Sequence, residues 1–240
     1  MRYLWVICVA LLWPVALLAQ APTCTPTATF TYLGATTLEA EESESYSGSA
    51  PVLAEFKANP SNLGDYSARY TWYFIDATTR DTLFTRNEEE TSYTFQKSGS
   101  FVVELRANFD SGTDMILYPE EGEEPVRFNV SIPESKLEMP NAFSPNGDEY
   151  NEIYRAKDTH QSIVKFRATI FNRWGQRLYS WDNVNGGWDG KVNGKVVKDG
   201  VYFVNVEALG ADGREYRIRK DVNVLTRKVE NGGTGTSAEE

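Results

Sequence analysis

The chain has 240 residues and contains 24 Lys and Arg and 34 Asp and Glu, so its formal net charge is −10. This acidity excludes a typical nucleic-acid-binding protein, because such proteins neutralise phosphates with clustered basic side chains. Two Cys and one His exclude a scaffold stapled by several disulfides and a His-rich metal site. The hydrophobic content of 41% and the aromatic content of 13% predict a folded chain rather than a disordered one.

The N-terminus has the pattern of a secretory signal peptide. Arg2 provides a positive charge, an apolar run extends from Tyr3 to Ala19, and Ala19 is a small residue suited to the position before a cleavage point. An uncleaved membrane anchor is the alternative. The run is slightly shorter than the roughly 20 residues that a spanning helix needs, and it contains Pro14. We therefore predict a signal peptide over residues 1–20 that is cleaved during export.

Cleavage of this peptide would leave Cys24 as the only thiol of the mature chain. The residues before it, Ala21-Pro22-Thr23, lack the aliphatic and small residues that directly precede a lipidated cysteine. Lipidation is therefore disfavoured, and the alternative is that the single Cys pairs between two chains.

The acidity belongs to one part of the chain. Residues 21–136 contain 8 Lys and Arg and 19 Asp and Glu, a net charge of −11, whereas residues 137–227 contain 14 and 12, a net charge of +2. Such a change in composition indicates a domain boundary, and Pro133 and Pro140 flank it. Residues 228–240 are almost free of apolar side chains, which predicts a flexible tail.

The apolar pattern along both domains is that of β-strands. Apolar and polar residues alternate from Val126 to Ile132, as is typical of a strand with one buried face. The dipeptides Asp189-Gly190, Asn193-Gly194 and Asp212-Gly213 predict hairpin turns, because Gly adopts positive φ without steric cost. Further strands are predicted over Arg69–Ile75, Ser100–Ala107, Lys165–Phe171, Arg177–Trp181, Gly200–Leu209 and Arg214–Leu225. This spacing predicts an all-β chain with two antiparallel immunoglobulin-like β-sandwiches in tandem after the cleaved signal peptide.

Residues 139–227 contain several segments that occur in the same order in one known family. They are MPNAFSPNGDEYNEIYR (139–155), FNRWGQRLYSW (171–181), GGWDG (186–190), KDGVYFVNVEA (198–208) and KDVNVLTR (220–227). Through them the region 137–227 resembles the C-terminal sorting domain of the type IX secretion system, in its type B variety, also called the gliding-motility-associated C-terminal domain. Two departures stand out. Glu149 and Asn151-Glu152 replace a usual Gly and Asn-Asp, and about 13 residues follow Arg227 where the family's last strand ends the protein.

The resemblance implies a route of export. Proteins with such a domain cross the inner membrane by their signal peptide and are recognised by the secretion machinery in the periplasm through the folded domain. They then pass the outer membrane, where the domain is typically cleaved and the protein is held at the surface, often through a lipopolysaccharide. We therefore expect this chain at the outer-membrane surface or outside the cell, and the two departures leave cleavage of its sorting domain open.

The first domain has a resemblance of its own. Within residues 50–132, TWYFID (71–76) stands where PKD-like immunoglobulin-type domains have a Trp-x-Phe run, and SYTFQKSGSFVVELRA (92–107) resembles their next pair of strands. The Gly-Asp-Gly that usually follows the aromatic run is replaced by Asp76-Ala77-Thr78. The resemblance implies a PKD-like sandwich for residues 21–136.

Two segments of the sorting domain are candidates for the surface that the secretion machinery reads. They are Asn172, Arg173, Trp174 and Gly175, and Gly187, Trp188, Asp189 and Gly190. A structural role is the alternative for both segments. Trp174 and Trp188 would then pack in the core, while the glycines would turn the chain.

Side-chain oxygens are concentrated between residues 146 and 152. Calcium prefers six to eight oxygen ligands in a flexible loop, so the oxygens of this loop could bind calcium. Asx turns explain the same residues equally well, because the loop lacks the ligand spacing of an EF-hand. The candidate ligands are Asn146, Asp148, Asn151 and Glu152, and no other cofactor is expected.

Three consecutive aromatic residues, Trp72, Tyr73 and Phe74, must divide between the two faces of a strand. One ring could stay exposed, and Trp72 could then contact a ligand such as a sugar. The alternative is a core position with one aromatic ring at the edge of the sheet.

No catalytic arrangement is apparent in the sequence. The acidic runs at 88–90 and 120–124 lack the opposed carboxylates with one raised pKa that glycoside hydrolysis requires. His160 lies in a polar stretch, and no Ser-His-Asp spacing is present. We predict no enzymatic activity.

Together these features predict an exported cell-surface protein whose C-terminal domain is the type IX secretion signal and whose first domain is a small interaction module. Because the passenger is small, we expect an accessory or signalling component of the secretion system. The alternatives are a plain surface cargo or adhesin, and a carbohydrate-binding module. The expected partner is the type IX secretion machinery, with lipopolysaccharide attachment after cleavage. We expect no nucleic-acid partner and no transmembrane helix after signal removal.

Overall fold

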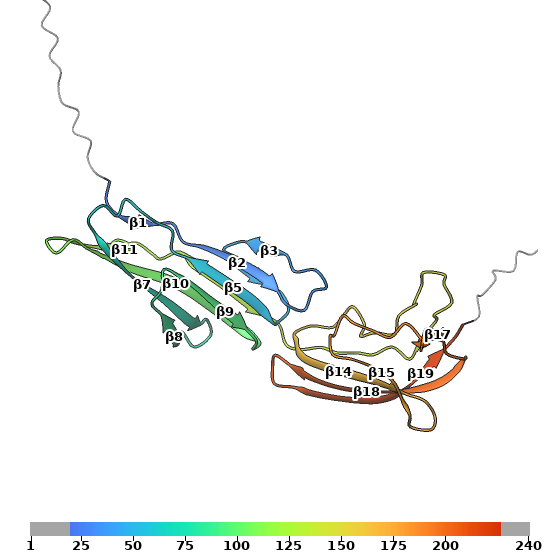
Figure 1. Ribbon diagram of the computed structural model, residues 1–240. Coiled ribbons are helices and arrows are strands. Elements are labelled where there is room, and N and C mark those ends of the chain that lie inside the picture. The colour runs from blue at the N-terminus through green and yellow to red at the C-terminus, as the bar shows by residue number, and fades with distance from the viewer. Residues whose placement is uncertain (1–19, 227–240) are drawn as a thin grey trace, which may run out of the picture.

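The computed structural model describes residues 20–226 of the chain. Every regular element among them is a β-strand, which confirms the predicted all-β fold. The strands form two bodies that lie end to end (Figure 1). The predicted tail and, apart from Gln20, the predicted signal peptide lie outside the described residues. A helix long and apolar enough to cross a membrane does not occur between residues 20 and 226.

The N-terminal body contains the first twelve strands. They are β1 (Thr23–Cys24), β2 (Thr27–Tyr32), β3 (Ala40–Glu42), β4 (Ser45–Ser47), β5 (Val52–Lys57), β6 (Pro60–Ser61), β7 (Ser67–Asp76), β8 (Thr82–Arg86), β9 (Glu90–Phe95), β10 (Gly99–Asp110), β11 (Met115–Tyr118) and β12 (Arg127–Ile132). One sheet has the order β4-β12-β10-β7-β8, with β11 also paired to β10, and the other has the order β3-β2-β5-β9. This body is therefore an immunoglobulin-like sandwich, as predicted, and its PKD-like character stays a prediction.

The strands of the sandwich form where apolar residues alternate with polar ones. In β12, Phe128, Val130 and Ile132 are buried and the residues between them are exposed, so one face of the strand packs on the opposite sheet. The predicted strand Arg69–Ile75 lies within β7, and Ser100–Ala107 lies within β10. These two strands pair antiparallel over their length and form the centre of the larger sheet.

The core of the N-terminal body is aromatic. The ring of Phe56 lies 5.6 Å from that of Trp72 and 5.6 Å from that of Phe128, between centroids. Phe74, two residues after Trp72 on the same face of β7, lies 5.7 Å from Phe56. Such tilted and edge-on contacts are the favoured arrangement of aromatic pairs.

The C-terminal body contains one large sheet. Its strands are β13 (Ala142–Phe143), β14 (Ile163–Phe171), β15 (Arg177–Trp181), β16 (Lys191–Val192), β17 (Lys195–Val196), β18 (Gly200–Gly210) and β19 (Glu215–Val224). The order in the sheet is β13-β19-β18-β14-β15, and β16 and β17 form a separate hairpin. All four strands predicted for this half of the chain are thereby confirmed.

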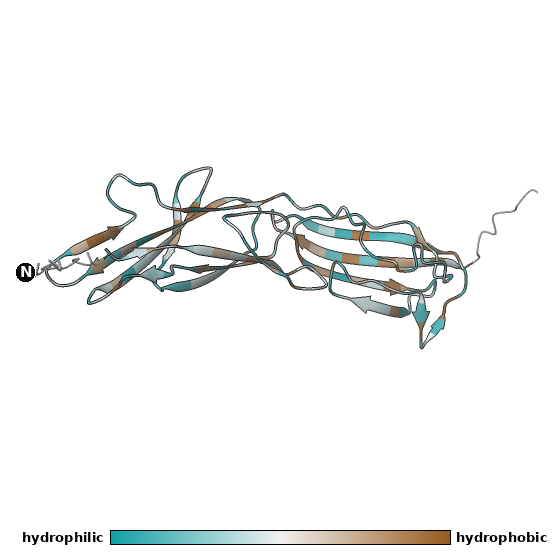
Figure 2. Ribbon diagram, turned by 90° about the horizontal axis from the view of Figure 1, so that it is seen from above, coloured by the Kyte–Doolittle hydropathy of each residue, from teal (hydrophilic) through white to brown (hydrophobic). Residues whose placement is uncertain are grey.

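One face of this sheet is covered and the other is not. In β14, Phe166, Ala168 and Ile170 are buried while Lys165 and Arg167 are exposed, and the same alternation runs along the neighbouring strands (Figure 2). Most of the irregular chain of this body lies on one side of the sheet (Figure 1). That irregular chain, with the β16–β17 hairpin, forms the second layer in place of a complete second sheet.

The predicted turn dipeptides take the backbone conformations that their residue types favour. Asn193 and Gly194 both have positive φ, 52° and 77°, and join β16 to β17. Gly213 also has positive φ, and the Asp212 side chain accepts a hydrogen bond from the Arg214 N–H at 3.0 Å, which closes the β18–β19 hairpin. These are the positive-φ positions that Gly and Asn occupy with least steric cost.

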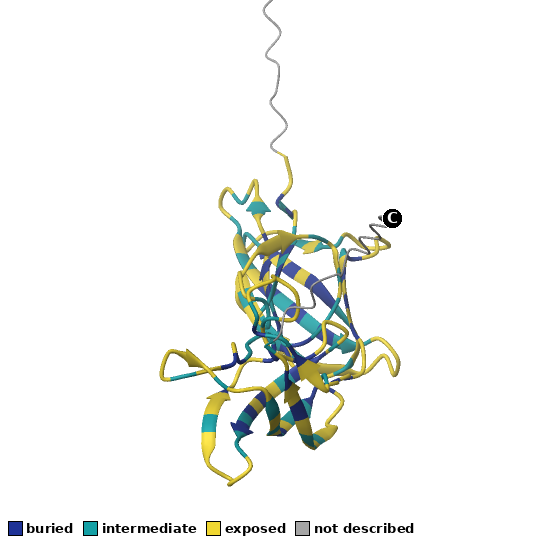
Figure 3. Cartoon of the chain, turned by 90° about the vertical axis from the view of Figure 1, so that its right-hand side faces the viewer, coloured by how far each residue is buried: buried dark blue, intermediate teal, exposed yellow. Residues whose placement is uncertain are grey.

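The two bodies have separate hydrophobic cores that meet at a contact. Ala211, in the β18–β19 turn of the C-terminal body, packs in the core of the N-terminal body. Its main-chain oxygen accepts a hydrogen bond from the Ser98 N–H at 3.1 Å. The Asn185 side chain also donates to the main-chain oxygen of Gly34. Buried residues are concentrated inside each body, whereas most loops are exposed (Figure 3).

Candidate functional site

The turn between β14 and β15 is a compact structure built around Asn172. Its side-chain oxygen accepts hydrogen bonds from the N–H groups of Trp174 and Gln176, both at 3.0 Å. Its main-chain oxygen accepts from Gly175, also at 3.0 Å, and Gly175 has a φ of 77°. An Asn that bonds its own backbone two residues on, followed by a Gly in the left-handed region, explains why this sequence turns here. The turn is thereby fixed in shape.

The tip of this turn presents an exposed aromatic and cationic pair. Trp174 is 81% exposed, and the guanidinium carbon of Arg173 lies 5.6 Å from the centre of its ring, within the range of a cation–π interaction. The alternative that Trp174 packs in the core is therefore wrong, and its place in a recognition surface stays a prediction. The hydrogen bonds of Asn172 bend the chain away from the sheet before Trp174, so its ring cannot continue the buried face of β14.

An open hollow of about 620 Å³ lies beside this turn, on the uncovered face of the sheet. Phe171 and Phe203 line it and are directly paired across β14 and β18. Arg173, Arg219 and Asp221 also line it, so an apolar floor is combined with charged side chains. Phe203 is 42% exposed, although it lies within a strand.

Sequence reasoning did not single out Phe203 and Arg219. A signal was present, because Val201, Tyr202, Phe203 and Val204 are apolar in succession, and such a run must place apolar side chains on both faces of a strand. The uncovered face of β18 carries Val201 and Phe203, both exposed.

The second predicted recognition segment lies in a different environment. Trp188 is 0% exposed, its indole Nε1 donates to the main-chain oxygen of Lys191 at 3.0 Å, and its backbone pairs with Tyr154. A Cβ on Gly187 would lie 2.5 Å from Ile153, and one on Gly190 would lie 2.7 Å from Pro145. Trp188, Gly187 and Gly190 are therefore packing residues, and the expectation that they form a recognition surface is wrong for these three.

Asp189 is the exposed member of that segment. Its carboxylate accepts a hydrogen bond from the Lys191 N–H at 3.0 Å and lies 3.2 Å from the Lys191 ammonium. Burial alone would raise the pKa of Asp189, but the hydrogen bonds and charge of Lys191 outweigh it and lower the pKa. These contacts give Asp189 a local structural role as the turn residue before β16.

Side-chain oxygens of the loop at 146–152 accept hydrogen bonds from groups within the same loop. The Asn146 amide donates to Asp148 at 2.8 Å, and the Asp148 N–H lies 2.7 Å from the Glu152 carboxylate. Asn151 has a positive φ of 52°. Asx turns therefore account for the loop geometry, and calcium binding stays a prediction. Among residues 20–226, no group of three His, Cys, Asp and Glu side chains is arranged to hold a metal ion.

The predicted ligand contact at Trp72 is wrong. Trp72 is 0% exposed, and its indole Nε1 donates to the main-chain oxygen of Glu88 at 3.0 Å. Tyr73 takes the other face of β7, where it is half-buried and lies 6.0 Å below the guanidinium of Arg106. The three aromatics do divide between the two faces of the strand, but Trp72 and Phe74 share the inner one because their positions differ by two.

Neither Cys24 nor His160 is arranged for catalysis. Cys24 is buried in the core of the N-terminal body. Burial, together with the charge of Glu89, raises the pKa of its thiol to about 11, so the thiol stays protonated and unreactive at neutral pH. His160 lies on the surface with its Nδ1 2.9 Å from the main-chain oxygen of Lys157.

Comparison with known proteins identifies the C-terminal body. The family model of the CHU_C type IX secretion signal domain matches residues 137–220. No curated protein sequence matches the chain.

Two solved structures are similar to the chain at low identity. The first is dimeric latent PorU from Porphyromonas gingivalis, with 12% identity and a TM-score of 0.26, over 84% of this chain and 20% of that chain. The second is a set of fibronectin(III)-like modules of CbhA from Clostridium thermocellum, with 11% identity and a TM-score of 0.22, over 81% of this chain and 94% of that chain. The chain thus spans about a fifth of the PorU chain. At these TM-scores the likenesses say nothing about function.

A type IX secretion signal domain implies interaction with the secretion machinery and export to the cell surface or the extracellular space. Four of the five segments that carry the sequence resemblance lie within the matched residues, and the fifth, 220–227, begins at the last of them. Residues 137–220 of this chain therefore match the CHU_C type IX secretion signal domain, and they follow an immunoglobulin-like sandwich.

Proposed function

We propose that the secretion machinery recognises this cargo through the turn Asn172–Gln176 and the hollow beside it. The observation that carries the proposal is the 81% exposure of Trp174. A large aromatic ring held in solvent is unfavourable for an isolated protein and is typical of a binding surface. Because Asn172 fixes the turn, binding would immobilise few groups and would lose little conformational entropy.

The hollow extends this surface with complementary chemistry. Phe171 and Phe203 provide apolar area, and Arg173 and Arg219 provide planar hydrogen-bond donors beside it. Aromatic residues and Arg are enriched at protein–protein contacts because they combine large buried area with directed polar groups. The proposed recognition depends on these placed groups more than on the net charge of the domain, which is +2 over residues 137–227.

The test compares two exposed aromatic residues of the same body. Trp174→Ala removes the ring at the turn, and Tyr150→Ala removes one that is 76% exposed in the loop at 146–152. We expect Trp174→Ala to accumulate in the periplasm while Tyr150→Ala reaches the surface like the wild type. Both variants are first checked for a wild-type unfolding midpoint. Normal surface delivery of a folded Trp174→Ala protein would reject the proposal.

We further propose that residues 21–136 are a small non-catalytic interaction module and that residues 137–227 act as the export signal, after a signal peptide at 1–20. The residues of the two cores support this division. Apart from Val164 and Ala211, the first core contains no residue after Ile132, and the second core begins at Leu137. Deletion of residues 137–240 tests it. A truncated chain that still reaches the surface would contradict the role of the C-terminal body.

Attachment to a lipopolysaccharide at the surface remains a proposal that follows from the secretion route, and the mass of the surface form would test it. The expected accessory or signalling role has no support in the described residues or in the matched family, so the proposal is limited to a displayed cargo. The carbohydrate-binding alternative loses its candidate contact with the burial of Trp72.

A further inference from the structure

The segment that joins the two bodies, Pro133–Asn141, is bonded along its length, and we call it the strap. It begins directly after β12 and ends where β13 begins. Ser135, Leu137 and Met139 are buried, and Leu137 and Met139 belong to the core of the C-terminal body. A connection between domains is ordinarily exposed and has few contacts, so a strap in which alternate side chains are buried calls for a physical account.

The first half of the strap is held by the β18–β19 hairpin. Ser135 donates from its N–H and its hydroxyl to the Asp212 carboxylate, at 3.1 and 2.7 Å. The Tyr216 hydroxyl donates to the main-chain oxygen of Ser135 at 2.9 Å. On the side of the N-terminal body, the Ser98 hydroxyl donates to the main-chain oxygen of Pro133 at 2.9 Å. Hydrogen bonds thus hold the residues on both sides of the exposed Glu134.

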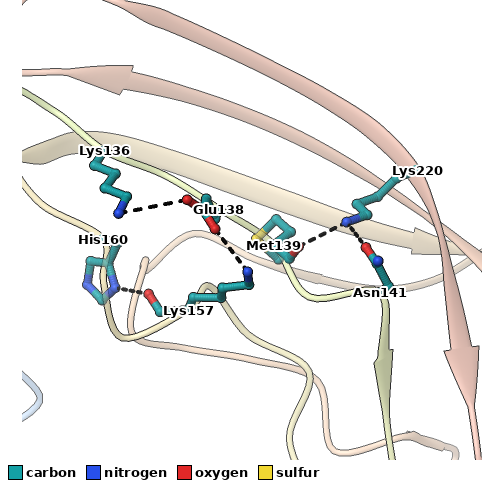
Figure 4. Close-up of polar contacts among 7 residues, drawn as sticks. All are labelled: Lys136, Glu138, Met139, Asn141, Lys157, His160 and Lys220. Carbon is teal, nitrogen blue, oxygen red and sulfur yellow. Dashed lines mark hydrogen bonds and ion pairs between the residues drawn. The ribbon is translucent and has the colours of Figure 1, made fainter.

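The second half of the strap is held by charged side chains and by the loop at 157–161 (Figure 4). Lys136 exchanges backbone hydrogen bonds with Gln161 at 3.0 and 2.9 Å. The Glu138 carboxylate lies 2.9 Å from the Lys157 ammonium and 3.8 Å from that of Lys136. The Lys220 ammonium donates to the main-chain oxygen of Met139 at 2.9 Å and also to the Asn141 side chain.

The main-chain oxygens of the last two residues of the strap also accept hydrogen bonds. The Tyr154 hydroxyl donates to the main-chain oxygen of Pro140 at 3.1 Å, and the Asn223 N–H donates to that of Asn141 at 2.9 Å. Partners for these bonds therefore come from the layer of irregular chain and from β19. Releasing the strap would break contacts with several elements together.

We propose that the strap protects the joint between the two bodies from general proteolysis before export, so that the signal domain stays attached until the secretion machinery has recognised it. A protease needs an extended stretch of backbone that can leave the protein surface, and susceptibility follows the burial and hydrogen bonding of that backbone. Cleavage of a folded chain proceeds through local opening, at a rate that follows the population of the open form. Opening Pro133–Asn141 exposes Leu137 and Met139 and leaves main-chain oxygens without their donors.

The experiment is limited proteolysis of the full mature chain with a protease of broad specificity, followed by mass spectrometry of the fragments. The exposed loop at residues 120–124 serves as an internal reference. We expect cuts in that loop while the strap stays intact. Cleavage within Pro133–Asn141 at the rate of the reference loop would overturn the proposal.

A matched pair of variants tests the contacts themselves. Tyr216→Phe removes the hydroxyl that bonds Ser135, and Tyr202→Phe removes a hydroxyl on the adjacent strand that bonds the main-chain oxygen of Lys198 at 3.0 Å. We expect cleavage in the strap to become at least about five-fold faster in Tyr216→Phe, because this hydroxyl contacts both the main-chain oxygen and the hydroxyl of Ser135 at 2.9 Å. In Tyr202→Phe it should match the wild type. Equal rates in both variants, at equal global stability, would show that the strap contacts do not protect.

The same proposal has a readout on cells. We expect the intact mass of the chain held in the periplasm of secretion-deficient cells to include both bodies. A periplasmic form that ends between residues 133 and 141 would overturn the protection, whether or not Trp174 is needed for export. The two proposals therefore fail separately.

Discussion

Tyr154 and Trp188 exchange two backbone hydrogen bonds, at 2.9 and 3.0 Å, and both side chains are fully buried. They come from two loops that cover the same face of the sheet in the C-terminal body. The Trp188 ring lies 5.4 Å from Phe143 and 5.7 Å from Tyr202, between centroids. This pair anchors the second layer of the body, which explains why a Trp flanked by glycines stands at this position.

Replacing the two tryptophans of the candidate segments should change the free energy of unfolding by different amounts, because one ring is buried and the other is exposed. Trp188→Ala removes a ring at the centre of a core and should lower the free energy of unfolding by about 3–5 kcal/mol. Trp174→Ala removes an exposed ring and should change it by no more than about 0.5 kcal/mol. Urea unfolding of both variants measures the difference. Similar values for the two would contradict the assignment of one ring to the core and the other to solvent.

Two glycines with nearly the same backbone conformation should respond differently to alanine. Gly190 has a φ of 74° and Gly194 a φ of 77°, so both substitutions place a Cβ in the left-handed region at a cost of roughly 1–2 kcal/mol. A Cβ on Gly190 would lie 2.7 Å from Pro145, whereas one on Gly194 meets nothing within 4 Å. Gly190→Ala should therefore lose about 1–3 kcal/mol more. Chemical unfolding checks the prediction, and equal losses would refute the close approach.

The ion pair in the strap should make stability depend on pH. The hydrogen bond and charge of Lys157, and the charge of Lys136, lower the pKa of Glu138 below its usual value of 4.5. A carboxyl whose pKa is lowered by folding stabilises the protein above its unfolded pKa, and this contribution is lost as the pH falls through the folded pKa. Glu138→Gln should therefore be less stable than the wild type at pH 7.

That difference should fade when the pH falls below about 4.5, the usual pKa of the carboxyl. Thermal unfolding across this pH range provides the measurement. Glu121→Gln, in the exposed loop between β11 and β12, serves as the control, and its difference from the wild type should not follow this pattern. A deficit of Glu138→Gln that stayed constant down to pH 3 would argue against the ion pair.

The thiol of Cys24 should be unreactive in the folded chain. Its pKa is raised to about 11 by burial and by the charge of Glu89, so almost none of it is thiolate at pH 8. Unfolding restores an ordinary thiol, and alkylation by iodoacetamide should then be faster by on the order of 100-fold. Mass spectrometry with and without denaturant provides the measurement. Rapid labelling of the native chain would mean that Cys24 is accessible and available for pairing between chains.

The strands could be predicted because their signal is local. Alternation in Val126–Ile132, and the turn dipeptide Asn193-Gly194, depend on neighbouring residues and on backbone sterics, so β12 and the β16–β17 hairpin follow from the sequence. The type of domain could also be recognised in advance, because the segments that carry the resemblance keep their order, and the family match over residues 137–220 bears this out.

The roles of the three tryptophans could not be predicted, because each depends on which surface a residue meets. The sequence neighbours of these residues are Thr and Tyr for Trp72, Arg and Gly for Trp174, and Gly and Asp for Trp188, and none of them decides whether the ring is buried. The pairing of β7 with β10 places Trp72 inside, the bridge to Tyr154 places Trp188 inside, and the hydrogen bonds of Asn172 place Trp174 in solvent.

By itself, the acidic composition excluded nucleic acid, and its uneven distribution, −11 against +2, indicated where one domain gives way to the next. The tertiary structure alone showed that the segment Pro133–Asn141 at this boundary is hydrogen-bonded, with alternate side chains buried, and is not a free linker. Ser135 meets Asp212, and Glu138 meets Lys157, across 77 and 19 residues of chain. Contacts of that separation arise only when the chain has folded, because they are set by the path of the backbone and not by neighbouring residues.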